Sequence, residues 1–390
     1  MTTETTPDKE VTPERPGWLE RIAPSDIDWK TVVVIPLLAV LSALIIGAVI
    51  IILTDGFGAV LPAYSALFRG AFVGWTSISE TLLAATPLIL AGLAVAVGFQ
   101  AGLFNIGVEG QMTIGGLTAV IVGFSFEGLP WLVHLPLAIF AGFLGGALWG
   151  FIPGVLRAKT GAHEVITTIM LNFIAYRTLD YMLKLPFIQK EGRFDPVSED
   201  VLASARFPRI LDWLPVENAS RLRLHLGFIL ALAVAWLIYW LLYRSTIGYE
   251  FRAVGASPSA AKYGGIGVAT AIIAVMTLSG GLAGLAGSNE TLGVVGRAVP
   301  GFTASIGFDA IALALLGRSH PGGVVMSAIL FGALRAGGRT MQAQSDVGID
   351  LIVVIQALII VFIAAPELIR SVYRVKGGKE QARVTRGWST

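Results

Sequence analysis

Long apolar stretches separated by short polar joints recur along the chain from about residue 31 to residue 368. One crossing of a bilayer by an α-helix needs about 20 mostly apolar residues, and most of these stretches approach that length. The joints between them carry most of the charged residues. The pattern therefore predicts ten membrane spans, at residues 31–54, 80–99, 103–124, 131–154, 163–183, 225–243, 268–288, 303–318, 322–340 and 348–368.

Two of the predicted spans differ from the others. Residues 103–124 and 303–318 are interrupted by glycine, and each carries a carboxylate, Glu109 or Asp309. Irregular backbone at membrane depth is typical of transporters, in which it lines a cavity or is buried in protein. We expect broken or re-entrant helices at these two places.

The interrupted spans also resemble each other. Residues 105–110 read Asn-Ile-Gly-Val-Glu-Gly and residues 305–310 read Ser-Ile-Gly-Phe-Asp-Ala, and the upstream strings "AGLAVAVG" and "GGLAGLAG" are alike as well. Such short matches also arise by chance, but a recurring acidic, glycine-hinged segment is typical of transporters built from two related halves. The expected fold is all-α: a polytopic membrane helix bundle of about ten transmembrane segments, in two pseudo-symmetric halves with broken or re-entrant helices.

Glycines recur at helical spacing in two of the predicted spans. Gly142, Gly146, Gly150 and Gly154 lie on one face of one span, and Gly280, Gly284 and Gly287 repeat the pattern later in the chain. Small residues spaced by four allow two helix backbones to approach closely within a membrane. These glycines predict helix packing and say nothing of a substrate.

Composition supports the membrane assignment and excludes several function classes. Hydrophobic residues make up 55% of the chain and charged residues 14%, with a mean hydropathy of +0.75, which a water-soluble surface would not accommodate. Without cysteine, and with four histidines outside any metal-ligand spacing, the sequence predicts no metal site. A dispersed net charge of +2 does not indicate a nucleic-acid partner. The sequence contains no pairing of a nucleophile with a base that would indicate an enzyme.

The distribution of Lys and Arg predicts the orientation. Sixteen of them lie in the tails and joints of one side, against four, Arg69, Arg297, Arg335 and Arg339, in the short joints of the other side. Because cytoplasmic joints are enriched in Lys and Arg, both termini are expected in the cytoplasm. The domains are then a cytosolic polar tail (1–30), a transmembrane domain (31–370) with an extracytoplasmic loop (184–224) and a cytosolic loop (244–266), and a basic cytosolic tail (371–390).

Polar side chains inside the predicted spans are candidates for a substrate path. A charge in the bilayer costs about 2–3 kcal/mol on insertion scales, so each such residue needs a reason. Lining a water-filled route is one reason; capping broken helices or bonding neighbouring helices is another, and the sequence leaves both open. An aromatic ring in these spans has two interpretations as well: it stacks on a solute, or it packs against lipid or neighbouring helices. The candidate path residues are Asn105, Glu109, Gln111, Asn172, Phe308 and Asp309.

Four strings together resemble a known family. They are "GLFNIGVEGQMTIGGLTA", "GAHEVITTIMLNFIAYR", "STIGYEFRAVGASPSAAKYGGI" and "IGFDAIALALLGRSHPGGVVMSAILFGALRAGG". They resemble the permease family of bacterial ATP-binding-cassette (ABC) importers for simple sugars and branched-chain amino acids, and within it the nucleoside-uptake branch. The resemblance covers roughly residues 35–370, and "FNIGVEGQM" is its most specific string.

The resemblance implies a function and a set of partners. The chain is expected to be the membrane-spanning permease that moves nucleosides, or related simple sugars, across the bacterial cytoplasmic membrane by alternating access. Its implied partners are a second permease subunit, cytosolic ABC ATPases, an extracytoplasmic substrate-binding lipoprotein, the small solute and the membrane lipid. The chain lacks a G-x-x-x-x-G-K-[ST] loop, so no cofactor is expected on it, and ATP with magnesium is expected on the ATPase.

The loop at 244–266 matches the family's cytosolic coupling loop, "RAVG-x-x-P-x-A-A". By this similarity Arg252, Gly255, Pro258, Ala260 and Ala261 dock on the ATPase; a solvated connector is the other interpretation. One departure is His163, which stands where the family commonly has Asn, so no substrate role is transferred to position 163.

An ion-coupled secondary transporter is the alternative function. In that case Glu109 and Asp309 would be the coupling carboxylates, and the two halves would rock about a site at mid-membrane. The match of the coupling loop argues against this alternative.

Overall fold

The structure, a computed structural model, describes residues 35–210, 222–345, 347–348 and 350–364. Over these residues it is helical, with two isolated β-bridges and no β-strand. The tails predicted at 1–30 and 371–390 lie outside the described residues, as do residues 211–221 of the predicted loop and the end of the span predicted at 348–368.

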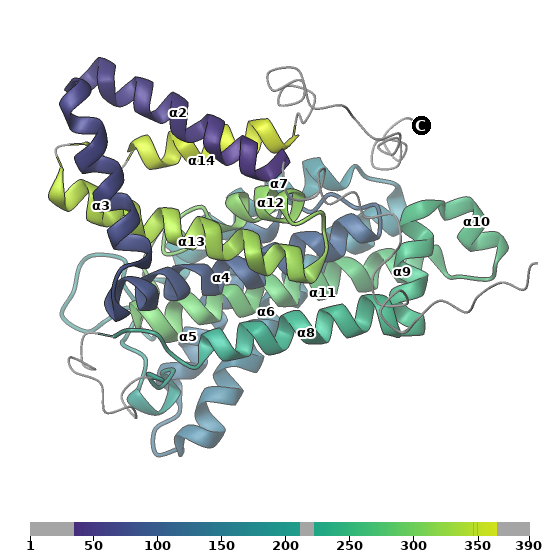
Figure 1. The fold of residues 1–390 in the computed structure, drawn as a ribbon. Helices are drawn as coiled ribbons and strands as arrows, with labels where there is room; N and C mark the ends of the chain where they lie inside the picture. The colour runs from purple at the N-terminus through teal and green to yellow at the C-terminus, as the bar shows by residue number, and fades with distance from the viewer. Residues whose placement is uncertain (1–34, 211–221, 346, 349, 365–390) are drawn as a thin grey trace, which may run out of the picture.

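Helix α11 (Val268–Asn289) lies at the centre of the bundle. It packs against α4 (Trp75–Gln100), α5 (Val108–Ser125) and α6 (Trp131–Thr160). Helices α8 (Gly227–Arg244) and α13 (Pro321–Gln344) also contact α4 (Figure 1). Helix α4 is buried without interruption from Ala85 to Gly98, where nearly all residues are apolar, as expected of a helix surrounded by other helices.

A second group of helices lies at the edge of the bundle. Helix α2 (Ile35–Asp55) lies beside α14 (Asp350–Ala364) at the top of Figure 1. After the short helix η2 (Phe57–Ala59), α3 (Val60–Phe72) connects α2 to the bundle and packs along α13. On the other side of the bundle, α7 (Glu164–Met182) packs against α5.

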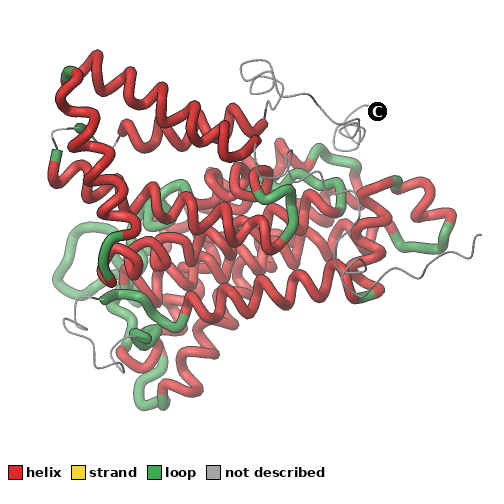
Figure 2. The backbone as a smooth tube through the Cα atoms, viewed as in Figure 1, coloured by secondary structure: helices red, strands yellow, loops and turns green. Residues whose placement is uncertain are grey.

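The two ends of the bundle differ. Helices α9 (Thr246–Ala256) and α10 (Pro258–Tyr263) project at one end, on the right in Figure 1, which we call the α10 end. The irregular chain from residue 183 to residue 210, with its short helix η3 (Ala203–Ala205), lies at the opposite end, which we call the loop end (Figure 2).

Two helices begin inside the bundle, as the interrupted spans predicted. After α4 reaches the α10 end, residues 101–107 return as irregular chain, and α5 starts at Val108 and runs to the loop end. After α11 and the π-helix η6 (Glu290–Val295) reach the loop end, residues 296–305 return, and α12 (Ile306–Leu316) runs to the α10 end. The two units therefore run in opposite directions, which is the arrangement of an inverted repeat.

Six helices among the described residues are long and apolar enough to cross a membrane: Leu37–Asp55, Trp75–Gln100, Trp131–Thr160, Gly227–Arg244, Val268–Val295 and Pro321–Gln344. The spans predicted at 103–124, 163–183, 303–318 and 348–368 correspond to α5, α7, α12 and α14, which do not pass this test. Helix α12 has only 11 residues because the chain before it is irregular. The described helices therefore form the polytopic bundle that was predicted, and the number of spans, about ten, stays a prediction.

Two details of the predicted joints were wrong. The joint between the first two spans contains helix α3, whose 13 residues are too few for a crossing and so gave no signal as a span; Arg69 lies on this helix. Arg335 and Arg339, assigned to an outer joint, lie within α13, which continues to Gln344. Both arginines form ion pairs with residues of neighbouring helices, so they are part of the bundle.

The glycine columns pack helices together, as predicted. A Cβ on Gly146 of α6 would lie 2.7 Å from the Cα of Gly284 on α11, and one on Gly150 would lie 2.9 Å from the Cα of Gly280. Helix α5 joins the same contact, because a Cβ on Gly115 would lie 2.8 Å from the carbonyl oxygen of Gly142. Three helices therefore meet backbone to backbone at the centre.

We expect Gly146→Val to destabilise the purified protein by about 1–3 kcal/mol, because the new side chain would collide with the backbone of α11. The measurement is the free energy of unfolding in mixed micelles. The control is Gly58→Ala, since nothing lies within 4 Å of a Cβ at that position. Equal stability of both variants and the unchanged protein would show that α6 and α11 do not pack as described.

Candidate functional site

The N-terminal ends of α5 and α12 meet at the carboxylate of Glu109. This side chain is 1% exposed and lies in the first turn of α5. One of its oxygens accepts a hydrogen bond from the hydroxyl of Thr303, and the other accepts one from the backbone N–H of Gly307, 2.7 Å away. Tyr176 of α7 interacts with the same carboxylate. Glu109 therefore joins the two irregular segments and α7.

This position suits a buried negative charge. The first N–H groups of a helix have no partner within the helix, and its dipole places partial positive charge there. Glu109 lies at two such ends, its own on α5 and that of α12. A Cβ on Gly307 would lie 2.5 Å from the Cα of Glu109, so glycine is required for this approach.

Asn105 and Gln111 form a closed network that holds the first irregular segment. The side-chain amide of Asn105 donates to Gln111 Oε1 (2.9 Å) and to Ser279 Oγ (2.8 Å), and its oxygen accepts from the N–H of Gly107 (2.9 Å). The hydroxyl of Ser279 donates in turn to the carbonyl oxygen of Ala94 on α4. Both amides are buried, so the network replaces the backbone bonds that a broken helix lacks.

Asn172 has a similar role from α7. Its amide nitrogen donates to the carbonyl oxygen of Ile106 (2.9 Å), and its oxygen accepts from the N–H of Gly110 (2.8 Å). The side chain is 2% exposed. Four of the six candidate path residues, Asn105, Glu109, Gln111 and Asn172, are therefore buried and hydrogen-bonded to the protein in this conformation.

The second irregular segment is open where the first is closed. Pro300, Gly301, Ala304 and Ser305 are exposed, and Ala304 and Ser305 adopt positive φ angles of 45° and 62°. On α12, Phe308 is 42% exposed. Asp309 forms an ion pair with Arg335 of α13 (2.5 Å), and the two side chains remain 27% and 23% exposed. The remaining candidates, Phe308 and Asp309, thus lie on an accessible face.

The residues predicted to couple to an ATPase lie together at the α10 end. Ser257 caps α10 by accepting the N–H of Ala260, and Pro258 occupies the first turn. Ala261 is buried and Ala260 is exposed. Gly255 of α9 lies against the end of α4: a Cβ there would be 2.8 Å from the carbonyl carbon of Ala101.

Arg252 connects α9 to α8, and Gln100 connects α8 to α4 and to the chain before α13. Its guanidinium carbon lies 5.2 Å from the centre of the Tyr243 ring on α8, a cation–π distance. The Tyr243 hydroxyl accepts a hydrogen bond from Gln100 at the end of α4, and Gln100 also donates to the carbonyl oxygen of Ser319 before α13. The coupling residues therefore contact the end of α4, next to the first returning segment, and the end of α8.

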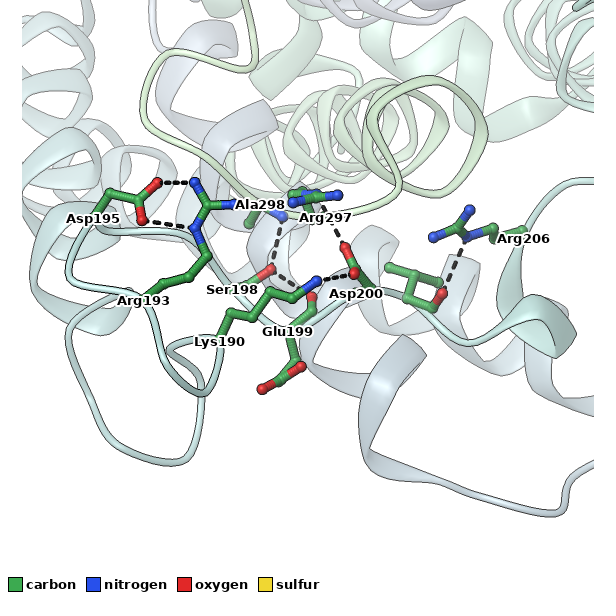
Figure 3. Close-up of polar contacts among 10 residues, drawn as sticks. Lys190, Arg193, Asp195, Ser198, Glu199, Asp200, Arg206, Arg297 and Ala298 are labelled. Carbon is green, nitrogen blue, oxygen red and sulfur yellow. Dashed lines mark hydrogen bonds and ion pairs between the residues drawn. The ribbon is translucent and has the colours of Figure 1, made fainter.

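At the loop end, polar contacts attach the long loop to the second irregular segment (Figure 3). Asp200 pairs with Lys190 and with Arg297 (3.0 Å). The N–H of Ser198 donates to the carbonyl oxygen of Ala298 (3.0 Å), and the Ser198 hydroxyl oxygen accepts from the N–H of Ala298 (2.8 Å). The hydrogen bond from Lys190 holds the pKa of Asp200 below its usual value, and Arg297 adds to this effect. We call these contacts the loop clamp.

Three residues of the site gave no signal in the sequence. Thr303 and Ser279 are hydroxyls in apolar surroundings, which are common in membrane helices, and Arg335 was counted in a joint. Each becomes recognisable only through a partner far along the chain, such as Glu109 for Thr303. Glu164 is simpler: it pairs with Arg157 across the turn between α6 and α7 (3.3 Å), as expected of a structural residue near the membrane edge.

Comparison with known proteins gives a family match and several relatives. Residues 77–364 match the family model described as branched-chain amino acid transport system / permease component. No solved structure matches the chain.

Three relatives align over nearly their whole length. The guanosine ABC transporter permease protein NupP of Bacillus subtilis is 42% identical over 87% of this chain and 94% of its own length. The nucleoside ABC transporter permease protein NupB of Lactococcus lactis is 36% identical over 86% and 92%. The glucose ABC transporter permease protein TsgB13 of Haloferax volcanii is 34% identical over 87% and 89%.

We expect Glu109→Ala to lower the free energy of unfolding by about 1–3 kcal/mol for each donor that loses its partner. Glu109→Gln should cost less, because its amide still accepts from Gly307 and donates to Thr303. In a double-mutant cycle with Thr303→Val, the two changes should be clearly less than additive. The exposed Glu127→Ala is the control. Additive losses would mean that Glu109 and Thr303 do not interact.

Proposed function

This chain belongs to the permease family of ABC importers, and from that premise we propose that it carries nucleosides through the cytoplasmic membrane as the translocating subunit of such an importer. Permeases of this kind do not hydrolyse ATP; a separate ATPase does. The energy must therefore enter this chain as a movement of one of its surfaces.

One contact supports this proposal most directly, the approach of Gly255 to the start of the first irregular segment. A Cβ on Gly102, whose φ is +70°, would lie 3.1 Å from the Cα of Gly255. Helix α9 therefore lies directly on the point at which the chain leaves α4. A rigid-body movement of α9 and α10, driven by ATPase closure, would press on this turn.

The contacts continue from that turn to the second irregular segment. Residues 101–107 are tied to α11 and α5 through Asn105, and α5 is tied to Thr303 and Gly307 through Glu109. Each step is a hydrogen bond between buried groups, which transmit displacement better than solvated ones do. Alternating access would follow from a shift of these two segments relative to each other.

The solute class rests on the relatives and on the site. The two most similar relatives reported above carry guanosine and nucleoside in their names, and the third carries glucose. A nucleoside is neutral and has an aromatic base, so it suits an accessible face with Phe308 and a paired Asp309. A simple sugar is the competing solute, and the uptake experiment separates the two.

The partners follow from the same assignment. We assign the α10 end to the cytoplasmic side, where an ATPase would contact α10 and where both termini would lie. The loop end would then face a substrate-binding lipoprotein, and a second permease subunit would complete the path. ATP and magnesium would be bound by the ATPase.

The ion-coupled alternative is less well supported. It requires a carboxylate that gains and loses a proton or binds an ion during transport. Glu109 accepts hydrogen bonds from Thr303 and Gly307, and Asp309 is paired with Arg335, so both candidate carboxylates already have partners in the protein.

The direct test is uptake of radiolabelled guanosine, uridine and ribose by cells that express the chain with or without its ATPase, second permease and lipoprotein. We expect nucleoside uptake only with the partners, and we expect it to persist when the proton gradient is collapsed while ATP is maintained. Uptake by this chain alone that disappears with the gradient would contradict the proposal, and uptake of ribose alone would contradict the solute class.

We expect Gly255→Val to uncouple the importer, because its side chain would separate α9 from the end of α4. ATP hydrolysis by the reconstituted complex should persist while nucleoside uptake falls by about tenfold or more. The matched control is Ala256→Val, at the next position, where the side chain is exposed. Normal uptake with Gly255→Val would remove α9 from the coupling route.

A further inference from the structure

The exposed chain between α11 and α12 requires water or protein beside it. Residues 300–305 are irregular, and Gly301, Ala304 and Ser305 are exposed. Lipid-facing backbone cannot be irregular within a bilayer, because its polar groups would have no partners. This face, with the first turn of α12, must therefore border an aqueous space or another subunit.

Charged side chains lead from this face to the loop end. Arg335 pairs with Asp309 (2.5 Å), and one turn further along α13 Arg339 pairs with Glu80 (3.3 Å), which also pairs with Arg223 (2.5 Å). The exposed fractions of these side chains run from 20% to 50%. We call these five residues the polar track.

The polar track is better suited to solute than to lipid. Ionisable residues within membrane proteins almost always face the interior or a water-filled cavity. Both carboxylates of the track, Asp309 and Glu80, are paired with arginine, so the track presents no unpaired acid that would hold a cation tightly. Such a surface suits a neutral solute with several hydrogen-bonding groups.

The inner end of the track combines two kinds of group that read a nucleobase. Phe308, 42% exposed, precedes Asp309 in the first turn of α12, about 100° around the helix from it, and offers an aromatic face. The described bond of the ion pair joins one guanidinium nitrogen, Nη2, to one carboxylate oxygen, Oδ2. The guanidinium has further N–H donors and the carboxylate has a further acceptor. Stacking together with edge hydrogen bonds is how proteins read unpaired bases.

We propose that Arg335, Asp309 and Phe308 form a transient binding site for the base of a passing nucleoside, with Arg335 as the specificity-determining residue. This inference rests on the proposed function and adds a solute-binding site within the permease itself, separate from recognition by the lipoprotein. The buried network of Asn105, Glu109 and Gln111 serves as its support.

The first test is photolabelling of the complete importer in proteoliposomes with 8-azidoguanosine, followed by mass spectrometry of the peptides. We expect label on residues 300–318 or on the segment of α13 around Arg335, competed by guanosine and not by ribose. Label confined to other parts of this chain, absence of label from it, or equal competition by ribose would overturn the proposal. This test uses the unchanged protein, so it does not depend on the folding of a variant.

The second test is uptake by three variants. Arg335→Lys keeps the charge but loses the planar set of guanidinium N–H donors, and Asp309→Asn replaces a charged acceptor with a neutral one. In each we expect KM for guanosine to rise about tenfold or more, as for the loss of one hydrogen bond to a charged group. The double variant Asp309→Arg with Arg335→Asp restores an ion pair and should still transport poorly, because donor and acceptor are exchanged.

The matched control is Arg177→Lys, an exposed arginine on α7. Wild-type KM in the exchanged double variant would show that the pair is only structural and would overturn the proposal. Failure of the unchanged importer to take up any nucleoside would instead refute the proposed function. Uptake by the unchanged importer with no effect in Arg335→Lys and Asp309→Asn would refute this inference alone.

Discussion

A carboxylate buried in the middle of a membrane protein is stable only if donors surround it, and the architecture of this chain depends on how Glu109 meets that requirement. Two of its donors, Thr303 and Gly307, lie in the other half of the chain, and Tyr176 of α7 interacts with it from the same half. The charge therefore cannot be satisfied by either half alone. The positions of both irregular segments, and of the helices that follow them, follow from this one contact and from the glycines that let the backbones approach.

The two irregular segments have related sequences and different surroundings. The first is closed by side-chain amides: Asn105 and Asn172 bond its backbone groups, and Gln111 holds Asn105 in place. The second is held by the loop clamp and, through Thr303, by Glu109, and it is exposed at Pro300, Gly301, Ala304 and Ser305. One repeat therefore provides a rigid support, while the other offers polar groups to a passing solute. A pseudo-symmetric fold does not require that both halves have the same function.

The sequence predicts the helical class, the irregular segments and the glycine contacts, because each depends on local composition or spacing. It does not predict that Glu109 is buried while Asp309 is accessible. Both are acids four residues after a polar residue, and only the partners, Gly307 in one case and Arg335 in the other, make one buried and one accessible. Helix α3 escaped prediction because its 13 residues, with Arg69 among them, are fewer than a crossing needs, and its packing on α13 is not a local property.

The separation of Glu109 from its partners has a consequence for the synthesis of the protein. Thr303 and Gly307 follow Glu109 by 194 and 198 residues. At typical rates of translation of about 5–20 residues per second, roughly 10–40 s pass before they leave the ribosome. During that interval the carboxylate lacks these two partners, so we expect α5 to settle at its final depth only after the second half has been made.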